Sequence, residues 1–260
     1  MTTDSVPYLS DRPNRKVLLA VELWDPVALA RVYQGVRVQA AGLTGSPLIS
    51  LSGRFVWLME GTSWPNSITV NPSGPLFVPQ TVPALARPAD LENAPASARL
   101  QQIILQLSAA YPLDDGLTSL RGRLLADVKP GSAPVADARV QLAWYDKYDN
   151  VWVPAPPVAG AGAQPNNDPL TDANGGFVVF MRVNPISPAQ PDVQNGMITV
   201  RLQFIQAGVN PANYVTPPNY PFVINDPAGP AAIPVPAGRV PEGRALERTL
   251  DFGLAQLTRL

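Results

Sequence analysis

The stretch Thr171-Asp172-Ala173-Asn174-Gly175-Gly176-Phe177-Val178-Val179-Phe180-Met181-Arg182-Val183 decides the fold class of this chain. Its Asp, Asn and two Gly residues supply the positive φ angles that a tight hairpin turn requires. The run that follows them is β-branched and aromatic, and it is too short for a helix. The stretch therefore predicts a turn that leads into a buried β-strand.

The same shape occurs earlier in the chain, in Ser52–Met59. Four further matches pair the two halves: Arg37-Val38-Gln39 with Arg139-Val140-Gln141, Ile68-Thr69-Val70 with Ile198-Thr199-Val200, Phe77-Val78 with Phe222-Val223, and Arg99 with Arg244. The separation between matched residues grows from 102 to 145 positions, as loop insertions in a second copy would produce. The pattern predicts a tandem repeat, although any two β-sandwiches share a similar rhythm of turns and strands.

Short strands separated by turns favour a β-sandwich in each half. We expect an all-β protein with two tandem Ig-like β-sandwich domains and long Pro-rich loops. The expected organisation is a flexible N-terminal arm at 1–14, a first domain at 15–110, a linker at 111–118 and a second domain at 119–260. Within the first domain we expect strands at 16–24, 31–39, 54–60, 67–70, 76–78 and 100–107, and a short helix within 84–98.

Composition narrows the chemistry that the chain can perform. The 31 prolines favour short strands and loops over helices, and the 46% hydrophobic content is enough for a real core. The chain has neither Cys nor His, which excludes disulfides, thiol catalysis, Cys-based metal sites and Ser-His triads. A net charge of −1 argues against binding nucleic acid or an anionic membrane. We expect no cofactor, no metal and no enzymatic activity.

The segment 121–177 carries a family resemblance. Its elements are Arg121-Gly122-Arg123-Leu124, then Ala133-Pro134-Val135-Ala136-Asp137-Ala138-Arg139-Val140, then Thr171–Phe177. They resemble the carboxypeptidase regulatory-like domain, a transthyretin-like sandwich, although Asp137 stands where that family commonly has Gly. The resemblance covers roughly residues 117–205 and implies an accessory module without catalytic residues of its own. A looser similarity of architecture links such domains to structural modules of phage-tail-like contractile injection particles.

Three groups of residues are candidate sites. Asp172 and Asn174 are oxygen ligands that Ca²⁺ uses, but a turn explains them better because calcium needs several carboxylates. Asp114-Asp115 and Asp146/Asp149 pair carboxylates, as acid–base hydrolases do, yet both pairs fall in predicted turns. The aromatic residues Trp144, Tyr145, Tyr148 and Trp152 flank a predicted hairpin tip. They suit an interaction surface, either a sugar-stacking platform or a protein hot spot, and they equally suit ordinary cross-strand packing.

The long Pro-rich segments 79–98, 154–170 and 206–243 are the remaining unusual feature, and we interpret them as subunit-contact arms. Together these features predict a non-enzymatic structural subunit or adaptor of a homo-oligomeric assembly, with protein partners and no membrane insertion. The narrowest form of this prediction is a cap, collar or baseplate component of a contractile injection particle. Lacking an apolar leader segment, the chain is expected in the cytoplasm or in a particle assembled there. The alternatives are a carbohydrate- or cell-surface-binding module and an Asp/Glu hydrolase.

Overall fold

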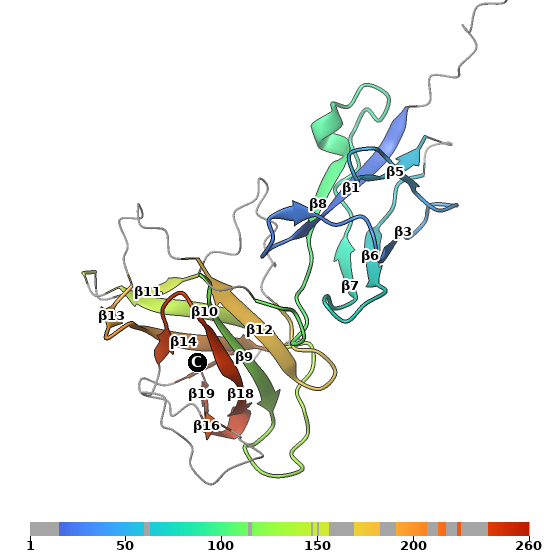
Figure 1. Cartoon of the computed structure of the whole chain (residues 1–260). Coiled ribbons are helices and arrows are strands. Elements are labelled where there is room, and N and C mark those ends of the chain that lie inside the picture. Colours follow the sequence, from blue (N-terminus) through green and yellow to red (C-terminus); the bar gives the residue numbers. More distant parts are fainter. Residues whose placement is uncertain are drawn as a thin grey trace, which may run out of the picture.

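The computed structural model describes residues 16–59, 63–113, 116–146, 148–149, 151–155, 169–182, 191–206, 213–216, 223–224 and 239–259. These residues form an all-β structure, without an α-helix in the described ranges, and so confirm the predicted fold class. Figure 1 shows two lobes, with β1–β8 in one and β9–β19 in the other. No strand of one lobe pairs with a strand of the other within the described part of the chain.

The first lobe packs one sheet against another across a single core. One sheet contains β1 (Val17–Asp25), β2 (Ala30–Arg31), β4 (Leu48–Ile49), β5 (Phe55–Leu58) and β8 (Leu100–Ile104). The other contains β3 (Val36–Ala40), β6 (Ser67–Pro72) and β7 (Gln80–Pro83). Their alternating apolar residues meet in the core, which includes Leu19, Val21 and Trp57 from the first sheet and Val38 and Ile68 from the second.

The second lobe repeats this arrangement with longer strands. One sheet contains β9 (Thr118–Leu125), β12 (Gly176–Met181), β16 (Val223–Ile224) and β18 (Ala245–Gly253). The facing layer contains β10 (Arg139–Asp146), β11 (Val151–Pro154), β13 (Val193–Gln194), β14 (Met197–Ile205), β15 (Asn213–Val215), β17 (Arg239–Pro241) and β19 (Thr258–Arg259). Phe177, Phe204 and Phe252 pack together in the core with ring centroids 5.5–5.8 Å apart.

The central strands pair in the same way in both lobes. β1 pairs antiparallel with β5 and parallel with β8, and β9 pairs antiparallel with β12 and parallel with β18. The antiparallel order β3–β6–β7 likewise corresponds to β10–β14–β15. The tandem repeat indicated by the sequence therefore appears as a repeated topology. The domain boundaries placed at 14, 110 and 118 stay a prediction.

The turn that opens β12 shows the repeat in atomic detail. The backbone N–H of Asp172 donates to the Gly176 carbonyl at 2.8 Å, and that of Ser50 donates to the Arg54 carbonyl at 2.9 Å. Gly175 and Gly53 occupy equivalent positions, with φ angles of 74° and 75°. A side chain at either position would be strained, so both glycines are required by the turn.

Several sequence expectations were wrong in detail. The strand expected at 31–39 is divided into β2 and β3 because Gly35 turns the chain with a φ of 66°. Residues 76–78 form only an isolated bridge, Phe77 to Leu107, and the strand lies later, at β7. The helix expected within 84–98 is reduced to a single 3₁₀ turn, η1 (Ala96–Arg99), because Pro88 and Pro95 interrupt the segment and have no backbone N–H to donate.

Two motif matches can also be checked against the backbone. Val38 pairs with Val70, whereas Val140 pairs with Phe204, so the match of Ile68–Val70 to Ile198–Val200 is out of register by four residues. Asp137 has a φ of 56°, the left-handed conformation that glycine adopts most easily. This explains how Asp137 fills a position where the resembled family commonly has Gly.

The N-terminal arm at 1–14 and most of the Pro-rich segments 154–170 and 206–243 lie outside the described residues.

Candidate functional site

The outer surface of the first sandwich carries an apolar area that we call the open face. It lies on the side of the β1–β5 sheet that points away from the core and consists of Val17, Ala20, Leu48, Val56, Leu58 and Leu100. Leu48 is 57% exposed and Val17 is 37% exposed. A hollow of about 780 Å³ lies over Ala20, Val56 and Leu100, between η1 and the Ser50–Arg54 turn. Exposed apolar surface of this kind marks sites of association.

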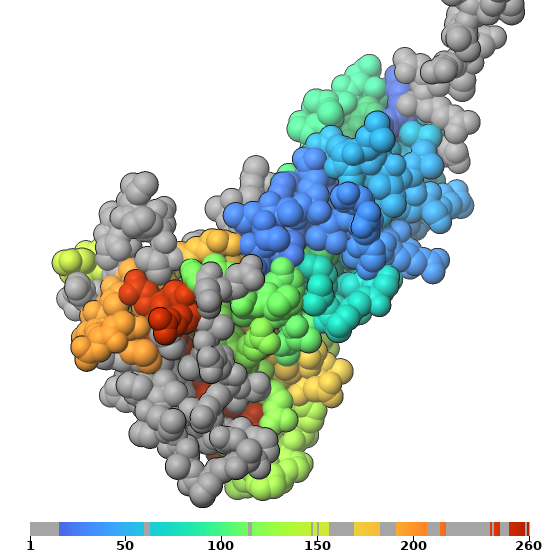
Figure 2. Space-filling view, viewed as in Figure 1, coloured from blue at the N-terminus to red at the C-terminus, as the bar shows by residue number. Residues whose placement is uncertain are grey.

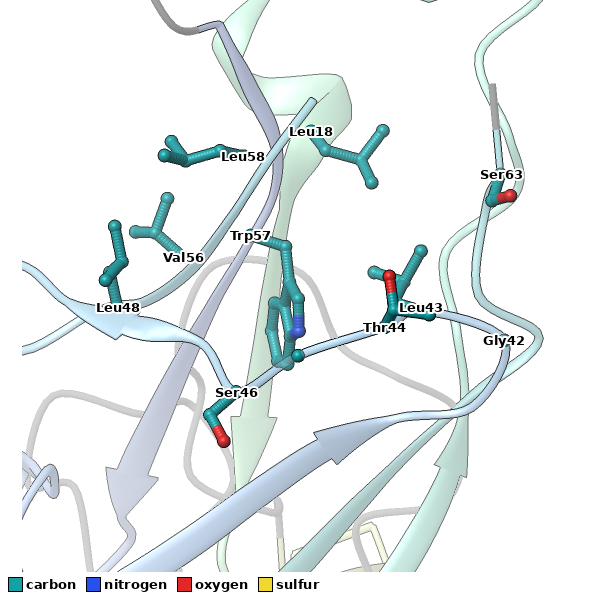
Figure 3. Close-up of a pocket in the computed structure, with 11 residues that line it drawn as sticks. Leu18, Gly42, Leu43, Thr44, Ser46, Leu48, Val56, Trp57, Leu58 and Ser63 are labelled. Carbon is teal, nitrogen blue, oxygen red and sulfur yellow. The ribbon is translucent and has the colours of Figure 1, made fainter. Parts of the chain in front are cut away.

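A second, smaller hollow of about 240 Å³ adjoins the open face near Leu48 and Val56. Figure 3 shows the Trp57 indole pointing toward the loop that carries Leu43, Thr44 and Ser46. The indole Nε1 is buried and has no hydrogen-bond partner among the residues that the structure describes. The exposed Leu51 continues this apolar surface beyond β4.

A polar cluster around Glu22 borders the open face. Glu22 is 1% exposed, and its carboxylate forms ion pairs with Arg31 at 3.0 Å and Arg54 at 2.6 Å. Gln102 Nε2 also donates to it, at 3.0 Å. Burial raises the pKa of Glu22, but the hydrogen bonds from Gln102 and Arg54 and the charges of both arginines outweigh it, so the pKa lies below its ordinary value. The Glu22 carboxylate is therefore held by both arginines and Gln102 in a structural network, which leaves it unavailable for acid–base chemistry.

The equivalent outer face of the second sandwich is covered. Val178 of β12 corresponds to Val56 of β5, yet it is only 1% exposed. It packs in a cluster with Val27 and Leu107 of the first lobe, and with Tyr111 and Leu117 of the connecting segment. Figure 2 shows the two lobes in direct contact at this region. We call this cluster the junction.

Polar contacts hold the junction in a defined geometry. The Tyr111 hydroxyl donates to Asp25 Oδ2 at 2.6 Å, and Asp25 Oδ1 accepts from the backbone N–H of Val27 at 2.8 Å. Arg182 donates across the junction to the Val27 carbonyl. Arg121 donates to the Ala109 carbonyl at 3.2 Å and also to the Tyr111 carbonyl. The two sandwiches are therefore joined by both packing and hydrogen bonds.

The aromatic residues predicted as an interaction surface do not all lie together. Tyr145 and Trp152 are cross-strand partners on the outer face of β10 and β11, with ring centroids 5.4 Å apart. Tyr148, at the hairpin tip, is 68% exposed. Including Trp144 was wrong: it is 7% exposed and packs in the second core, because successive strand residues point to opposite faces.

Sequence reasoning missed one member of this aromatic site. The Arg201 guanidinium lies 4.8 Å from the centroid of the Trp152 ring. The alternation of β14 places Arg201 on the same outer face, a signal that the sequence Met197–Phe204 already contained. Burial lowers the pKa of the Arg201 guanidinium below its ordinary value, although the group stays protonated.

Asp146 and Asp172, two of the carboxylate candidates, accept backbone hydrogen bonds from turns. Asp146 is 1% exposed and its Oδ1 accepts from the backbone N–H of Tyr148 at 2.9 Å. Asp172 Oδ1 accepts from the backbone N–H groups of Asn174 and Gly176, both at 2.8 Å. Asp114 and Asp115 lie outside the described residues. Among the residues that are described, no three His, Cys, Asp or Glu side chains gather as metal ligands would, and no helix is long and apolar enough to span a membrane.

Comparisons with known proteins give little further identification. No family model matches the chain, so the carboxypeptidase regulatory-like resemblance stays a prediction, and no curated protein matches it either. Among solved structures, a streptococcal ancillary pilin aligns with a TM-score of 0.21 and 8% identity over 89% of this chain, which spans 62% of that pilin's length. The shaft pilin SpaA from Lactobacillus rhamnosus GG aligns with a TM-score of 0.20 and 10% identity, over 91% of this chain and 98% of that one. Alignments at this level do not establish a common fold.

Proposed function

We propose that the protein is a non-enzymatic structural subunit that assembles with further copies of itself through the open face of the first sandwich. The proposal rests on a difference between two equivalent surfaces, the outer faces of β5 and β12. The outer face of β12 is covered by the first sandwich of the same chain, while no segment among the described residues covers the outer face of β5. An apolar sheet face that is covered in one repeat and uncovered in the other suits covering by a neighbouring molecule.

The junction suggests which surface of the neighbour would fit. The end of the first sandwich that covers β12 is the Asp25–Val27 turn, where Asp25 accepts the backbone N–H of Val27. Its counterpart in the second sandwich is the loop after β9, where Asp127 accepts the backbone N–H of Val128 at 2.7 Å. If this loop seats on the open face of the next copy, the contact is heterologous and repeats from copy to copy. The proposal therefore predicts a chain or ring of subunits.

The assembly test uses one charge on the open face and a matched charge elsewhere. Sedimentation velocity of the full chain should show association that increases with concentration, and negative-stain images should show chains or rings. Val56→Glu should abolish association, because it would place an unpaired carboxylate within an apolar contact. Val151→Glu is the control: Val151 is 47% exposed on the β10–β11 hairpin, so this variant should associate like the unmodified protein.

Two results would contradict the assembly. One is a chain that remains a monomer up to roughly 100 µM, where even weak interfaces associate. The other is association that Val56→Glu leaves unchanged while circular dichroism shows an intact fold.

The narrower expectations belong to the same proposal. A cap, collar or baseplate role in a contractile injection particle requires sheath, tube or baseplate genes beside this one, and inspection of the neighbouring genes would test it. We further propose that assembly takes place in the cytoplasm. Cell fractionation that recovers the protein only outside the cell and apart from any particle would contradict this.

A further inference from the structure

The outer face of the second sandwich carries a compact set of aromatic, cationic and amide side chains. Trp152 of β11 and Tyr145 of β10 are directly opposite each other, and Arg201 of β14 reaches Trp152 across the intervening strand β10. Ala143 lies between Pro154 and Arg201 in the registers, and its short side chain leaves room for the guanidinium to cross. The rings and the guanidinium therefore form one continuous surface on a rigid sheet.

Among the described residues, no carboxylate neutralises the charge of Arg201. No carboxylate lies within ion-pair distance of its guanidinium among the described residues, and its buried Nε has no hydrogen-bond partner among them. The nearby Asp192 donates its backbone N–H to the Tyr145 carbonyl at 2.9 Å, while its carboxylate accepts from Gln194 at 3.0 Å. A half-buried arginine without a counter-charge is ready to pair with an anion from outside.

The first sandwich provides a direct contrast. Arg31 also stacks on a tryptophan, with its guanidinium 5.4 Å from the centroid of the Trp24 ring. That arginine is paired with Glu22 at 3.0 Å and donates to the Ser52 carbonyl at 3.3 Å. In both arginines the buried Nε has no hydrogen-bond partner among the described residues, so the two stacks differ in the counter-charge: Arg31 has Glu22, and Arg201 has no carboxylate partner among these residues.

Two amide side chains lie beside Arg201 on the same face. Gln141 and Gln203 are cross-strand partners, and both are half-buried. Within the described part of the chain, neither side chain forms an intramolecular hydrogen bond. Amide groups both donate and accept, so this pair can bind neighbouring hydroxyl groups of a ligand.

We propose that this surface binds an acidic carbohydrate, a sugar chain that contains uronic acid units. Arg201 would pair with the carboxylate of a uronate, Trp152 and Tyr145 would pack against the apolar face of a sugar ring, and Gln141 and Gln203 would bind its hydroxyls. The free amide pair favours a polyhydroxylated ligand over a protein surface, since the centre of a protein interface is largely apolar. The site lies on a different sandwich from the open face, so it is independent of the proposed assembly.

Isothermal titration calorimetry of the full chain tests this site. The probes are trisaccharides of galacturonate, glucuronate and mannuronate, with maltotriose as a neutral sugar and tetraglutamate as an acidic peptide. At least one uronate trisaccharide should bind, with maltotriose at least about tenfold weaker because it lacks the charge-assisted pair. Arg201→Met should weaken uronate binding by about tenfold or more, and Trp152→Ala should weaken it for any sugar that binds.

Arg31→Met is the matched control. It removes the arginine that stacks on Trp24 and pairs with Glu22, and it should leave uronate affinity unchanged. Arg201→Met should also leave the sedimentation profile unchanged, which separates this site from the assembly. Three results would overturn the proposal: no uronate probe binds, maltotriose binds as tightly as the uronates, or tetraglutamate binds as tightly and loses affinity in Arg201→Met.

Discussion

The two sandwiches use the same backbone plan and differ in what they place on their outer surfaces. The turns Ser50–Arg54 and Asp172–Gly176 have the same backbone hydrogen bonds, and the strands that follow them pair in the same way. Within the part of the chain that the structure describes, the outer face of β5 is open and that of β12 is covered. In the same residues, Arg31 of the Trp24 stack has a carboxylate partner and Arg201 of the Trp152 stack has none. Backbone geometry is therefore shared between the repeats, whereas the surfaces that can bind a partner have diverged.

The largest effect on stability is expected from Glu22, whose carboxylate pairs with Arg31 of the Arg31–Trp24 stack. Glu22→Gln should destabilise the protein by about 2–3 kcal/mol, since it leaves two half-buried arginines without a counter-charge. Asp251→Asn is the comparison in the second lobe, where the carboxylate pairs with Arg123 at 2.8 Å. We expect it to cost less, because Arg123 is 48% exposed and water can solvate its charge. Urea unfolding measures both.

The pH dependence of stability sharpens the same comparison. The folded state lowers the pKa of Glu22 below its ordinary value of 4.5, so the unfolded chain binds the proton more readily. The stabilisation is therefore complete above about pH 4.5 and is lost as the pH falls through the folded-state value. Glu22→Gln should unfold with less pH dependence in this acidic range. A variant with the same acid sensitivity as the unmodified protein would assign that sensitivity to other carboxylates.

An intermediate effect is expected at the junction, which covers β12 and has no counterpart on β5. Tyr111→Phe removes the hydroxyl that donates to Asp25 and should destabilise the protein by about 1–2 kcal/mol, because the buried carboxylate loses a donor. Differential scanning calorimetry should then show the two lobes unfolding over a wider temperature range. An unchanged, single sharp transition would mean that packing around Val178 alone couples the lobes.

The smallest effect is expected from the two equivalent turns. Asp172→Ala should cost about 1 kcal/mol, because Asp172 Oδ1 caps the backbone N–H groups of Asn174 and Gly176. Ser50→Ala should cost only about half as much, since Ser50 Oγ accepts a single backbone bond, from Arg54 at 3.1 Å. Urea unfolding of both variants tests this order, and equal losses would show that the glycines, not the side-chain caps, determine the turns.

The sequence predicted the turns and strands better than it predicted their register and the side of the sheet that each residue faces. The turn–strand units that contain β5 and β12 were identified correctly, as far as the described residues extend, because glycine position and β-branched runs are local signals. The register of β14 against β10 was missed by four residues, since an Ile-Thr-Val match carries no information about cross-strand partners. Trp144 was placed on the surface because proximity along the hairpin was considered without its alternation.

The candidate surfaces were predicted only in part. Tyr145, Tyr148 and Trp152 came from the sequence, whereas Arg201 lies 49 residues beyond Trp152 and meets it only through the sheet. The sequence predicted a buried strand at Phe177–Met181, an uninterrupted apolar run, and the run Phe55–Leu58 has the same character. Nothing in these two runs distinguishes the covered strand from the open one.

By itself, then, the sequence determined the all-β class, the repeated turns and the absence of Cys and His chemistry, because these follow from residue type and short-range spacing. Only the tertiary structure decided which of the two equivalent sheet faces is covered. It also decided which of the two arginine–tryptophan stacks has a carboxylate partner among the described residues. Both outcomes depend on contacts between residues far apart in the chain. Those contacts are formed when the sheets pack, and local pattern does not encode them.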